Sequence, residues 1–396
     1  MLKKHFSTNL PKLEEQGHSF IYFLTEDSIL SLSDDFTYTL LTIPSHSHPE
    51  VTMTHGRLPE PLVGKYQIPG YGSWFDCMAA AAIVYTSLAD GCVKMFDLAA
   101  NELIEAVSIP EACRPVAEGF DSHFVRYDDV SKQIVACYQT DGDLQVICGH
   151  VERKEFENIG HMAMPLQNAG GLIVQRSKFG IVFGVQVFDT EIFELGVIQC
   201  SKMIKVRFPL SQGILVVSAA LVADSTLVVL FNEADDRYGS MILNLKCAEA
   251  IGLNTYHFSS TNEGLTKVAL GHTSSAKGTL TGELFYNPEH NDLWYGLYGS
   301  IHNSKLIRSE GQLKFYSGKP LELNQSYKED CDYYFSSALK GTSFAELTID
   351  FNTGHMEGTI YQAACLRTQY YWILSQICSQ NELMPTDIME IIDLLV

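Results

Sequence analysis

The sequence has 396 residues, of which 46% are hydrophobic and 19% are charged, so it can bury one large core or two ordinary ones. Its formal net charge of -20 comes from 27 basic and 47 acidic residues and repels phosphate backbones and anionic membrane surfaces. We therefore expect no nucleic-acid partner. No apolar run reaches the roughly 18 residues of a membrane span, so we expect no span either.

Ten cysteines are scattered along the chain without a CxxC pair. In a chain of this length they are typical of reduced thiols in a packed core. The first residues also lack the apolar segment of a secretory signal peptide. These features favour a cytoplasmic protein without a cofactor, although a nuclear-envelope location or secretion by a route without a signal would leave the same composition.

The N-terminal part is expected to begin with a polar arm over residues 1–18, followed by short strands at 20–24, 29–32 and 38–43 in an antiparallel meander. Residues 44–73 are rich in proline and glycine, which predicts a long surface loop around one strand at 51–54. From residue 78 onwards, short apolar strands follow one another between turns.

These strands fall into groups of about four, at 78–109, 122–149, 171–199 and 204–245, with a period of roughly 45 to 50 residues. Such a period is typical of a radial β array. We predict an all-β fold, a six- or seven-bladed irregular β-propeller over residues 19–361. Its part at 255–361, richer in glycine and aromatic residues, is either the last blades or a separate β domain. The strand at 20–24 is expected to complete the last blade.

One unit of the pattern recurs most clearly. Asp90-Gly91 forms a turn before an alternating strand, and Asp141-Gly142 repeats this turn. A set of five residues then recurs 92 positions later: Val93, Phe96, Asp97, Glu102 and Leu103 return as Val185, Phe188, Asp189, Glu194 and Leu195. We interpret Asp97 and Asp189 as turn-capping carboxylates, and Gly91 and Gly142 as the glycines of turns.

The run from Asp90 to Asp97 resembles the end of a WD repeat, with phenylalanine in place of the usual tryptophan. The Gly160-His161 pair precedes Phe188-Asp189 with 26 residues between, which is similar to the Gly-His pair of that family. The resemblance covers two or three repeats. It implies a propeller and, by analogy of fold alone, a role in docking other proteins.

Three groups of residues could form a chemical site, and each could instead have a structural role. His46, His48 and Glu50 share a short extended stretch and are weak candidates for a metal site, but a solvated loop is favoured because no second group completes the site. Cys77 beside Asp76, with His123 or His161, is a weak candidate for a thiol nucleophile and its base. The carboxylate pairs Glu102/Glu105, Asp128/Asp129 and Asp235/Asp236 are interpreted as solvated turns. No catalytic residue is assigned.

The C-terminal segment 362–396 has apolar residues at helical spacing, broken at Pro385, which predicts two helices. These helices either cover the β array or present an apolar face to a partner. The candidate partner-binding residues are Leu366, Tyr370, Ile373, Leu374, Ile377, Ile388, Ile391, Ile392 and Leu395.

The function that these features favour is an intracellular scaffold for protein–protein interaction, with basic or amphipathic protein partners because the chain is acidic. Two alternatives stay open: a propeller hydrolase or lactonase with its site at the mouth of the central channel, and the N-terminal propeller of a coat- or pore-type assembly. The sequence does not decide the oligomeric state.

Overall fold

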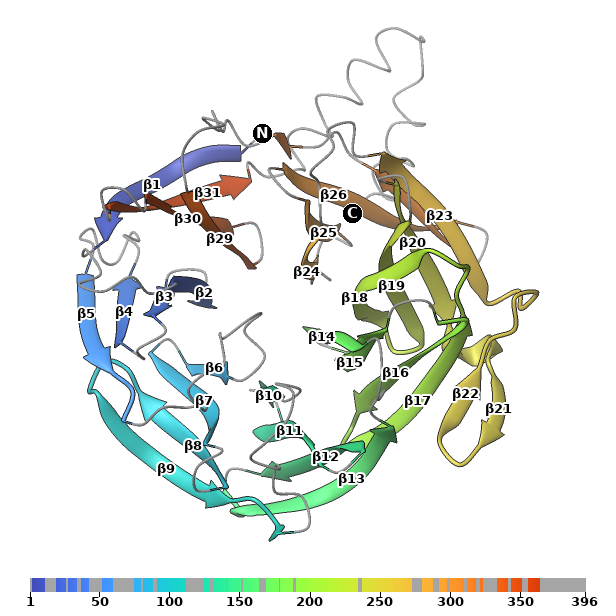
Figure 1. Cartoon of the computed structure of the whole chain (residues 1–396), viewed down its shortest axis with the longest axis horizontal. Coiled ribbons are helices and arrows are strands. Elements are labelled where there is room, and N and C mark those ends of the chain that lie inside the picture. Colours follow the sequence, from blue (N-terminus) through green and yellow to red (C-terminus); the bar gives the residue numbers. More distant parts are fainter. Residues whose placement is uncertain are drawn as a thin grey trace, which may run out of the picture. The chain divides into compact units, whose positions relative to one another are not determined.

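The computed structural model describes most of residues 2–363, and Figure 1 draws this part as coloured ribbon. The fold is all-β: no α-helix lies among the described residues, where η3 (Leu245–Cys247) is a single 3₁₀ turn. The segments outside the described residues are 1, 11–18, 26–27, 34–36, 43–51, 60–74, 80, 88–90, 112–123, 129–130, 141, 151, 164–168, 178, 188–189, 234–236, 273–279, 288–291, 298–299, 310–311, 318–320, 323–332, 341–342, 351–354 and 364–396.

The chain forms two compact units, and the larger one, Leu13–Gly282, contains five sheets. In the first four sheets, consecutive strands pair antiparallel. Their strands are β2 (Ser19–Thr25), β3 (Ser28–Ser33), β4 (Thr37–Thr42) and β5 (Thr52–Arg57); β6 (Phe75–Ala79), β7 (Ala82–Ser87), β8 (Cys92–Asp97) and β9 (Glu102–Ser108); β10 (Phe124–Asp128), β11 (Gln133–Gln139), β12 (Asp143–His150) and β13 (Glu155–Ala163); and β14 (Ala169–Ser177), β15 (Gly180–Val187), β16 (Ile192–Gln199) and β17 (Lys202–Pro209).

The fifth sheet contains β18 (Ile214–Ala223), β19 (Thr226–Glu233), β20 (Arg237–Asn244) and β23 (Leu265–His272). Between β20 and β23 the chain leaves this sheet and forms the hairpin of β21 (Glu249–Gly252) and β22 (Thr255–His257), which joins the fourth sheet instead. The fourth sheet therefore has six strands, in the order β14-β15-β16-β17-β22-β21.

The other unit comprises Met1–Lys12 and Glu283–Val396 and takes in the two remaining sheets. One contains β24 (Leu280–Asn287), β25 (Asp292–Leu297), β26 (Ser300–Ser309) and β27 (Gln312–Ser317), with β28 (Leu321–Glu322) beside β26. The other has the order β1-β31-β30-β29, from β1 (Leu2–Leu10), β31 (His355–Ala363), β30 (Ser343–Asp350) and β29 (Tyr333–Lys340).

The N-terminal expectation was wrong in one respect. The strand that completes the last sheet is β1, which pairs antiparallel with β31, and not the segment at 20–24, which begins the first sheet as β2. Residues 2–10 are therefore a strand within the predicted polar arm. In the strand order of this sheet β1 lies at the edge, and polar sequences are common in edge strands, so the polarity of residues 2–10 did not argue against a strand.

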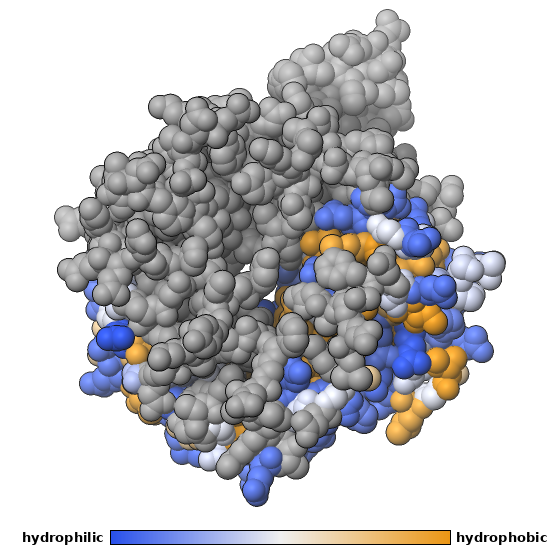
Figure 2. Space-filling model, viewed as in Figure 1, coloured by the Kyte–Doolittle hydropathy of each residue, from blue (hydrophilic) through white to orange (hydrophobic). Residues whose placement is uncertain are grey.

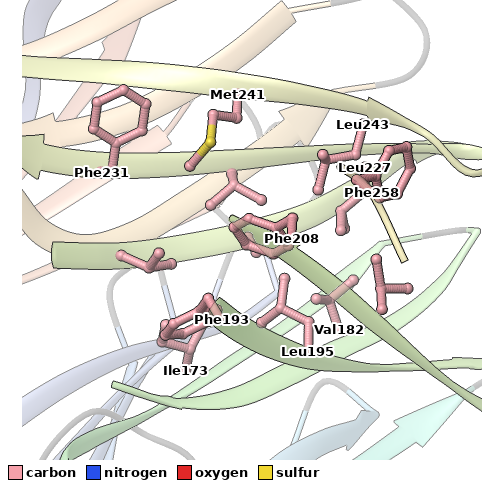
Figure 3. Close-up of a cluster of buried hydrophobic side chains, with 14 of the residues drawn as sticks. Ile173, Val182, Phe193, Leu195, Phe208, Leu227, Phe231, Met241, Leu243 and Phe258 are labelled. Atoms are coloured by element: carbon pink, nitrogen blue, oxygen red, sulfur yellow. The ribbon is translucent and has the colours of Figure 1, made fainter. Parts of the chain in front are cut away.

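The five sheets of the larger unit pack face to face in chain order. Four apolar clusters show this, since each contains buried side chains from two successive sheets. Figure 3 shows the cluster between the fourth and fifth sheets, where the rings of Phe193 and Phe208 lie 5.6 Å apart beside the side chains of Phe231 and Met241. Burial of such large side chains stabilises the fold by about 1.5–3 kcal/mol each. Sheets stacked in this way are the blades of a β-propeller.

Strand β8 shows how the sequence specifies this packing. Val93 and Met95 face the third sheet, whereas Phe96 faces the first, so both faces of the strand are buried. At its end, the Asp97 carboxylate accepts hydrogen bonds from the backbone N–H groups of Ala99 and Ala100, at 2.8 and 3.0 Å, and caps the turn. The turn is also held from the first sheet by Tyr38, whose hydroxyl donates to the Leu98 carbonyl at 2.7 Å.

The structure corrects the repeat on which the blade pattern was based. Phe96-Asp97 ends the third strand of its sheet, whereas Asp189 lies between β15 and β16, the second and third strands of another. The Asp-Gly turns that contain Gly91 and Gly142 also join second and third strands, so Asp189 corresponds in chain position to these turns. The φ angles of Gly91 and Gly142 are 64° and 80°. The predicted group at 78–109 coincides with the sheet β6–β9, and the groups at 122–149 and 171–199 begin with β10 and β14 but lack the fourth strands of their sheets. The group at 204–245 begins one strand early, with β17. The turn role of Asp189 itself lies outside the described residues.

Candidate functional site

The first strands of neighbouring sheets lie side by side, β2 against β6, β6 against β10 and β14 against β18. We call these five strands the inner strands; Figure 1 shows them on the inner side of the larger unit. Three of them contribute a charged side chain to one cluster: Asp76 from β6, Arg126 from β10 and Arg176 from β14. We call these three residues the inner charge cluster.

Asp76 connects the three sheets. Its Oδ2 atom lies 3.1 Å from a guanidinium nitrogen of Arg176, and it accepts a hydrogen bond from the backbone N–H of Tyr127 at 2.8 Å. Arg126 donates to the carbonyl of Val125 at 2.8 Å. The Asp76 side chain is largely buried, whereas 34% of the Arg176 side chain is exposed. One carboxylate thus binds groups of two other sheets, and solvent reaches one of the cations.

The three charged side chains of the cluster act on one another electrostatically. Burial lowers the pKa of the Arg126 guanidinium below its usual value, Asp76 opposes this shift, and the nearby charge of Arg176 adds to it. An arginine stays charged in proteins and donates hydrogen bonds without accepting them, so these residues suit anion binding better than proton abstraction.

The β21–β22 hairpin is the second unusual feature of this unit. Strand β22 runs parallel to β17, with Lys205 opposite Thr255, although all other neighbours in this sheet are antiparallel. The N–H of Lys205 donates to the Asn254 carbonyl at 2.7 Å, and the N–H of Phe258 donates to the Arg207 carbonyl at 2.8 Å. The Phe258 side chain is fully buried between the fourth and fifth sheets. The hairpin therefore covers the edge of β17 and is anchored at its base.

The tip of this hairpin exposes apolar side chains. Leu253 is 93% exposed and Ile251 is 50% exposed, the former at a turn position. Turns favour glycine, asparagine and aspartate, and Asn254 has the left-handed conformation, with φ of 55°, that this turn requires. The turn therefore does not need leucine. Figure 2 shows hydrophobic surface where the hairpin projects. A second exposed apolar pair, Leu103 and Ile104, lies on β9.

Most residues singled out from the sequence lie outside the described residues. This holds for the proposed metal ligands His46, His48 and Glu50, and for all nine apolar candidates of the C-terminal segment, which remain predictions. Among the described residues, no group of three or more His, Cys, Asp or Glu side chains is placed to hold a metal ion. His55, near the proposed metal ligands in sequence, lies on β5, where its Nδ1 is 3.0 Å from the Thr39 hydroxyl oxygen.

Of the other candidates, His123, Asp129, Asp235 and Asp236 lie outside the described residues. The described members are separated or have structural contacts. His161 lies on β13 of the third sheet, whereas Cys77 lies on β6 of the second. Of the carboxylate pairs, Glu105 binds Lys154 at 2.9 Å, which lowers its pKa. The Asp128 carboxylate accepts a hydrogen bond from the Ser131 hydroxyl.

Arg126 and Arg176 were not recognised from the sequence as site residues, and Asp76 was considered only as a neighbour of Cys77. A signal was present, because each of the three charges occurs in a short strand with apolar neighbours: Phe-Asp-Cys-Met, Phe-Val-Arg-Tyr and Leu-Ile-Val-Gln-Arg. A charged side chain in the first strand of several groups indicates a shared polar site. The hairpin gave no comparable signal, because its strands are short and exposed.

The part of the chain that the structure describes contains no helix of the length and apolarity needed to span a membrane.

Comparison with known proteins gives similarity of fold only. No family model matches the chain, and no curated protein matches it. Among solved structures, it is similar to the WD40 domain of coronin from Toxoplasma gondii, with 10% identity and a TM-score of 0.48 over 91% of this chain and 87% of that one. Hsv2 of Kluyveromyces lactis has 9% identity and a TM-score of 0.46, over 86% and 97% of the two chains. The β-propeller domain of Cps50 (Swd1) from Myceliophteria thermophila has 12% identity and a TM-score of 0.44, over 91% and 100%.

The order of strands within each sheet shows an all-β fold, and the stacking of successive sheets in the larger unit is that of a β-propeller.

Proposed function

We propose that this protein is an intracellular scaffold for protein–protein interaction and that the β21–β22 hairpin is one of its docking elements. The observation that carries the proposal is the exposure of Leu253 and Ile251 at the tip of a firmly anchored hairpin. Apolar groups presented together on a rigid element are typical of interaction sites. Cys92, Cys137, Cys148, Cys200 and Cys247 are free thiols, which supports a reducing compartment.

The partner that fits this surface is a basic, amphipathic protein segment. The chain has a net charge of -20, and Glu249 is exposed at the start of β21 beside the apolar tip. A segment with one apolar face and one basic face satisfies both features, and electrostatic attraction speeds its association. The C-terminal segment 362–396 is a second proposed contact for such partners.

A pair of double variants tests the hairpin. Leu253→Ser with Ile251→Ser removes the apolar tip, whereas Leu103→Ser with Ile104→Ser changes a similarly exposed pair on β9 and serves as the matched control. Fluorescence anisotropy measures binding of a labelled synthetic peptide of alternating Lys and Leu faces. We expect wild-type protein and the β9 variant to bind alike and the hairpin variant to bind at least about tenfold more weakly, since two apolar contacts are lost.

The charge contribution is tested by salt, because attraction between exposed charges is screened over about 10 Å at 0.1 M ionic strength. Binding should weaken as salt rises. Equal peptide affinity of the wild-type and hairpin variants would contradict the hairpin as the docking element. A truncated protein without residues 362–396 tests the C-terminal contribution separately, and full retention of peptide binding there would remove that segment from the proposal.

A further inference from the structure

We propose that the partner of the hairpin binds as an additional β-strand, paired through its backbone with the open edge of β21. The occupant is a short, extended segment of a protein partner that carries basic and apolar side chains. This mode of binding, which rests on the proposed docking role of the hairpin, uses backbone hydrogen bonds along a strand edge and the exposed apolar tip beside that edge.

Strand β21 lies at the end of its sheet. In the strand order β14-β15-β16-β17-β22-β21 it comes last, and β22 is its one neighbour among the described residues. All four of its residues, Glu249–Gly252, are exposed. A strand that is paired on one side directs about half of its backbone N–H and C=O groups away from the sheet. The edge can therefore accept one more strand.

Both ends of β21 are held in place before a partner arrives. Just before the strand, the Asn262 side chain donates a hydrogen bond to the Cys247 carbonyl at 2.9 Å. In the turn after the strand, the Asn254 carbonyl accepts a hydrogen bond from the Lys205 N–H at 2.7 Å. Because these contacts fix the edge in the free protein, binding a partner strand costs little ordering of the hairpin.

The composition of β21 leaves its edge unprotected and favours a basic partner. Edge strands are commonly protected from strand addition by lysine or proline, and the sequence Glu-Ala-Ile-Gly of β21 contains neither. Glu249 is the one charged residue within the strand, while Lys246 precedes it in η3. A basic side chain beside Glu249 and an apolar side chain beside Ile251 would each gain a favourable cross-strand contact.

The length of β21 limits the size of the contact. The strand has four residues, and its register with β22 shifts between Ala250 and Gly252. An added strand therefore forms few backbone hydrogen bonds. Leu253, 93% exposed in the following turn, supplies an apolar contact next to them. We therefore expect a short segment of the partner, and not a large folded surface, to occupy this edge.

The experiment uses the full chain and measures fluorescence anisotropy with two forms of the labelled Lys/Leu peptide. One form carries backbone N-methyl groups on two adjacent central residues, so that an extended peptide loses a donor on each of its edges. The matched form carries the same number of methyl groups on lysine side-chain nitrogens, which stay charged. We expect the backbone-methylated form to bind at least about tenfold more weakly, because strand addition needs the peptide N–H groups.

Amide hydrogen exchange of β21 gives an independent readout. In the complex with the side-chain-methylated peptide, at least one N–H of Glu249–Gly252 should exchange at least about tenfold more slowly, because it has become hydrogen-bonded. A helix lying on the apolar tip would contact side chains and leave these amides unchanged. Glu249→Gln should weaken binding about two- to fivefold, as for an exposed charge pair, whereas Glu263→Gln, exposed outside the hairpin, should not.

Equal binding of the two methylated peptides, or unchanged exchange of β21, would overturn strand addition. The docking role of the hairpin survives that result if Leu253→Ser with Ile251→Ser still weakens binding, and both proposals fail if this double variant binds like the wild-type protein. Equal affinity of Glu249→Gln and wild type would overturn the basic character of the segment. A dimer of the free protein that the double variant dissociates, seen by analytical ultracentrifugation, would assign the edge to a second copy instead.

Discussion

Replacement of Phe258 by alanine tests whether the hairpin is anchored as the structure indicates. The side chain is 0% exposed between the fourth and fifth sheets. Burial of a phenylalanine side chain stabilises a fold by about 1.5–3 kcal/mol, and the cavity left by its removal adds to the loss. Measured substitutions of this kind in protein cores cost about 3–5 kcal/mol. We therefore expect the free energy of unfolding of the larger unit to fall by about 4 kcal/mol.

The assay combines urea denaturation, followed by circular dichroism, with amide hydrogen exchange. Exchange of the Lys205 N–H reports on the hairpin, because this group donates to the Asn254 carbonyl. Hydrogen exchange of the Lys205 N–H should be faster in Phe258→Ala, because the hairpin has lost its anchor. Leu253→Ala is the control: its side chain is 93% exposed, so stability should change by no more than about 0.5 kcal/mol. Unchanged urea midpoint and unchanged Lys205 exchange in Phe258→Ala would refute the assigned anchor.

Three further predictions concern the turns and titrating groups. Gly142→Ala should destabilise the fold by about 1–2 kcal/mol in thermal unfolding, because its φ of 80° is unfavourable for alanine, whereas Gly252→Ala, without such a φ, should not. Burial raises the pKa of Tyr38 to about 12, so its contribution to stability is complete below pH 10 and is lost as pH rises towards 12; Tyr38→Phe should lack this loss in denaturation at alkaline pH. Burial also raises the pKa of the Cys137 thiol, so Ellman's reagent should modify exposed Cys200 in the native protein and Cys137 only after unfolding, as peptide mapping would show.

The alternation of apolar residues predicted the all-β class because strand pairing and burial depend on local pattern. Val93 and Met95 are an example, since both are buried on one face of β8 as their spacing indicates. The boundaries between blades were harder to predict from the sequence. Phe96-Asp97 ends the third strand of its sheet, whereas Phe188-Asp189 follows the second strand of another in the chain, so their similarity did not identify equivalent positions.

The candidate sites depended on contacts between residues far apart in the chain, which a local pattern does not contain. Asp76 and Arg176 are 100 positions apart in the numbering and meet because β6 and β14 are both first strands. The hairpin pairs with β17 after the chain has already entered the next sheet, and its parallel register has no counterpart in a simple meander.

The pairing of β1 with β31 has a consequence for biosynthesis. Leu2 lies opposite Ala363, so β1 is synthesised about 350 residues before the strand with which it pairs. At about 5–20 residues per second, this wait is roughly 20–70 s. During that time β1 lacks its partner strand, because β31 of the same chain has not yet been made. The β31 strand of another copy offers β1 the same pairing edge. We therefore expect dimers in which two copies exchange β1 to be the misfolded form to which this topology is most prone.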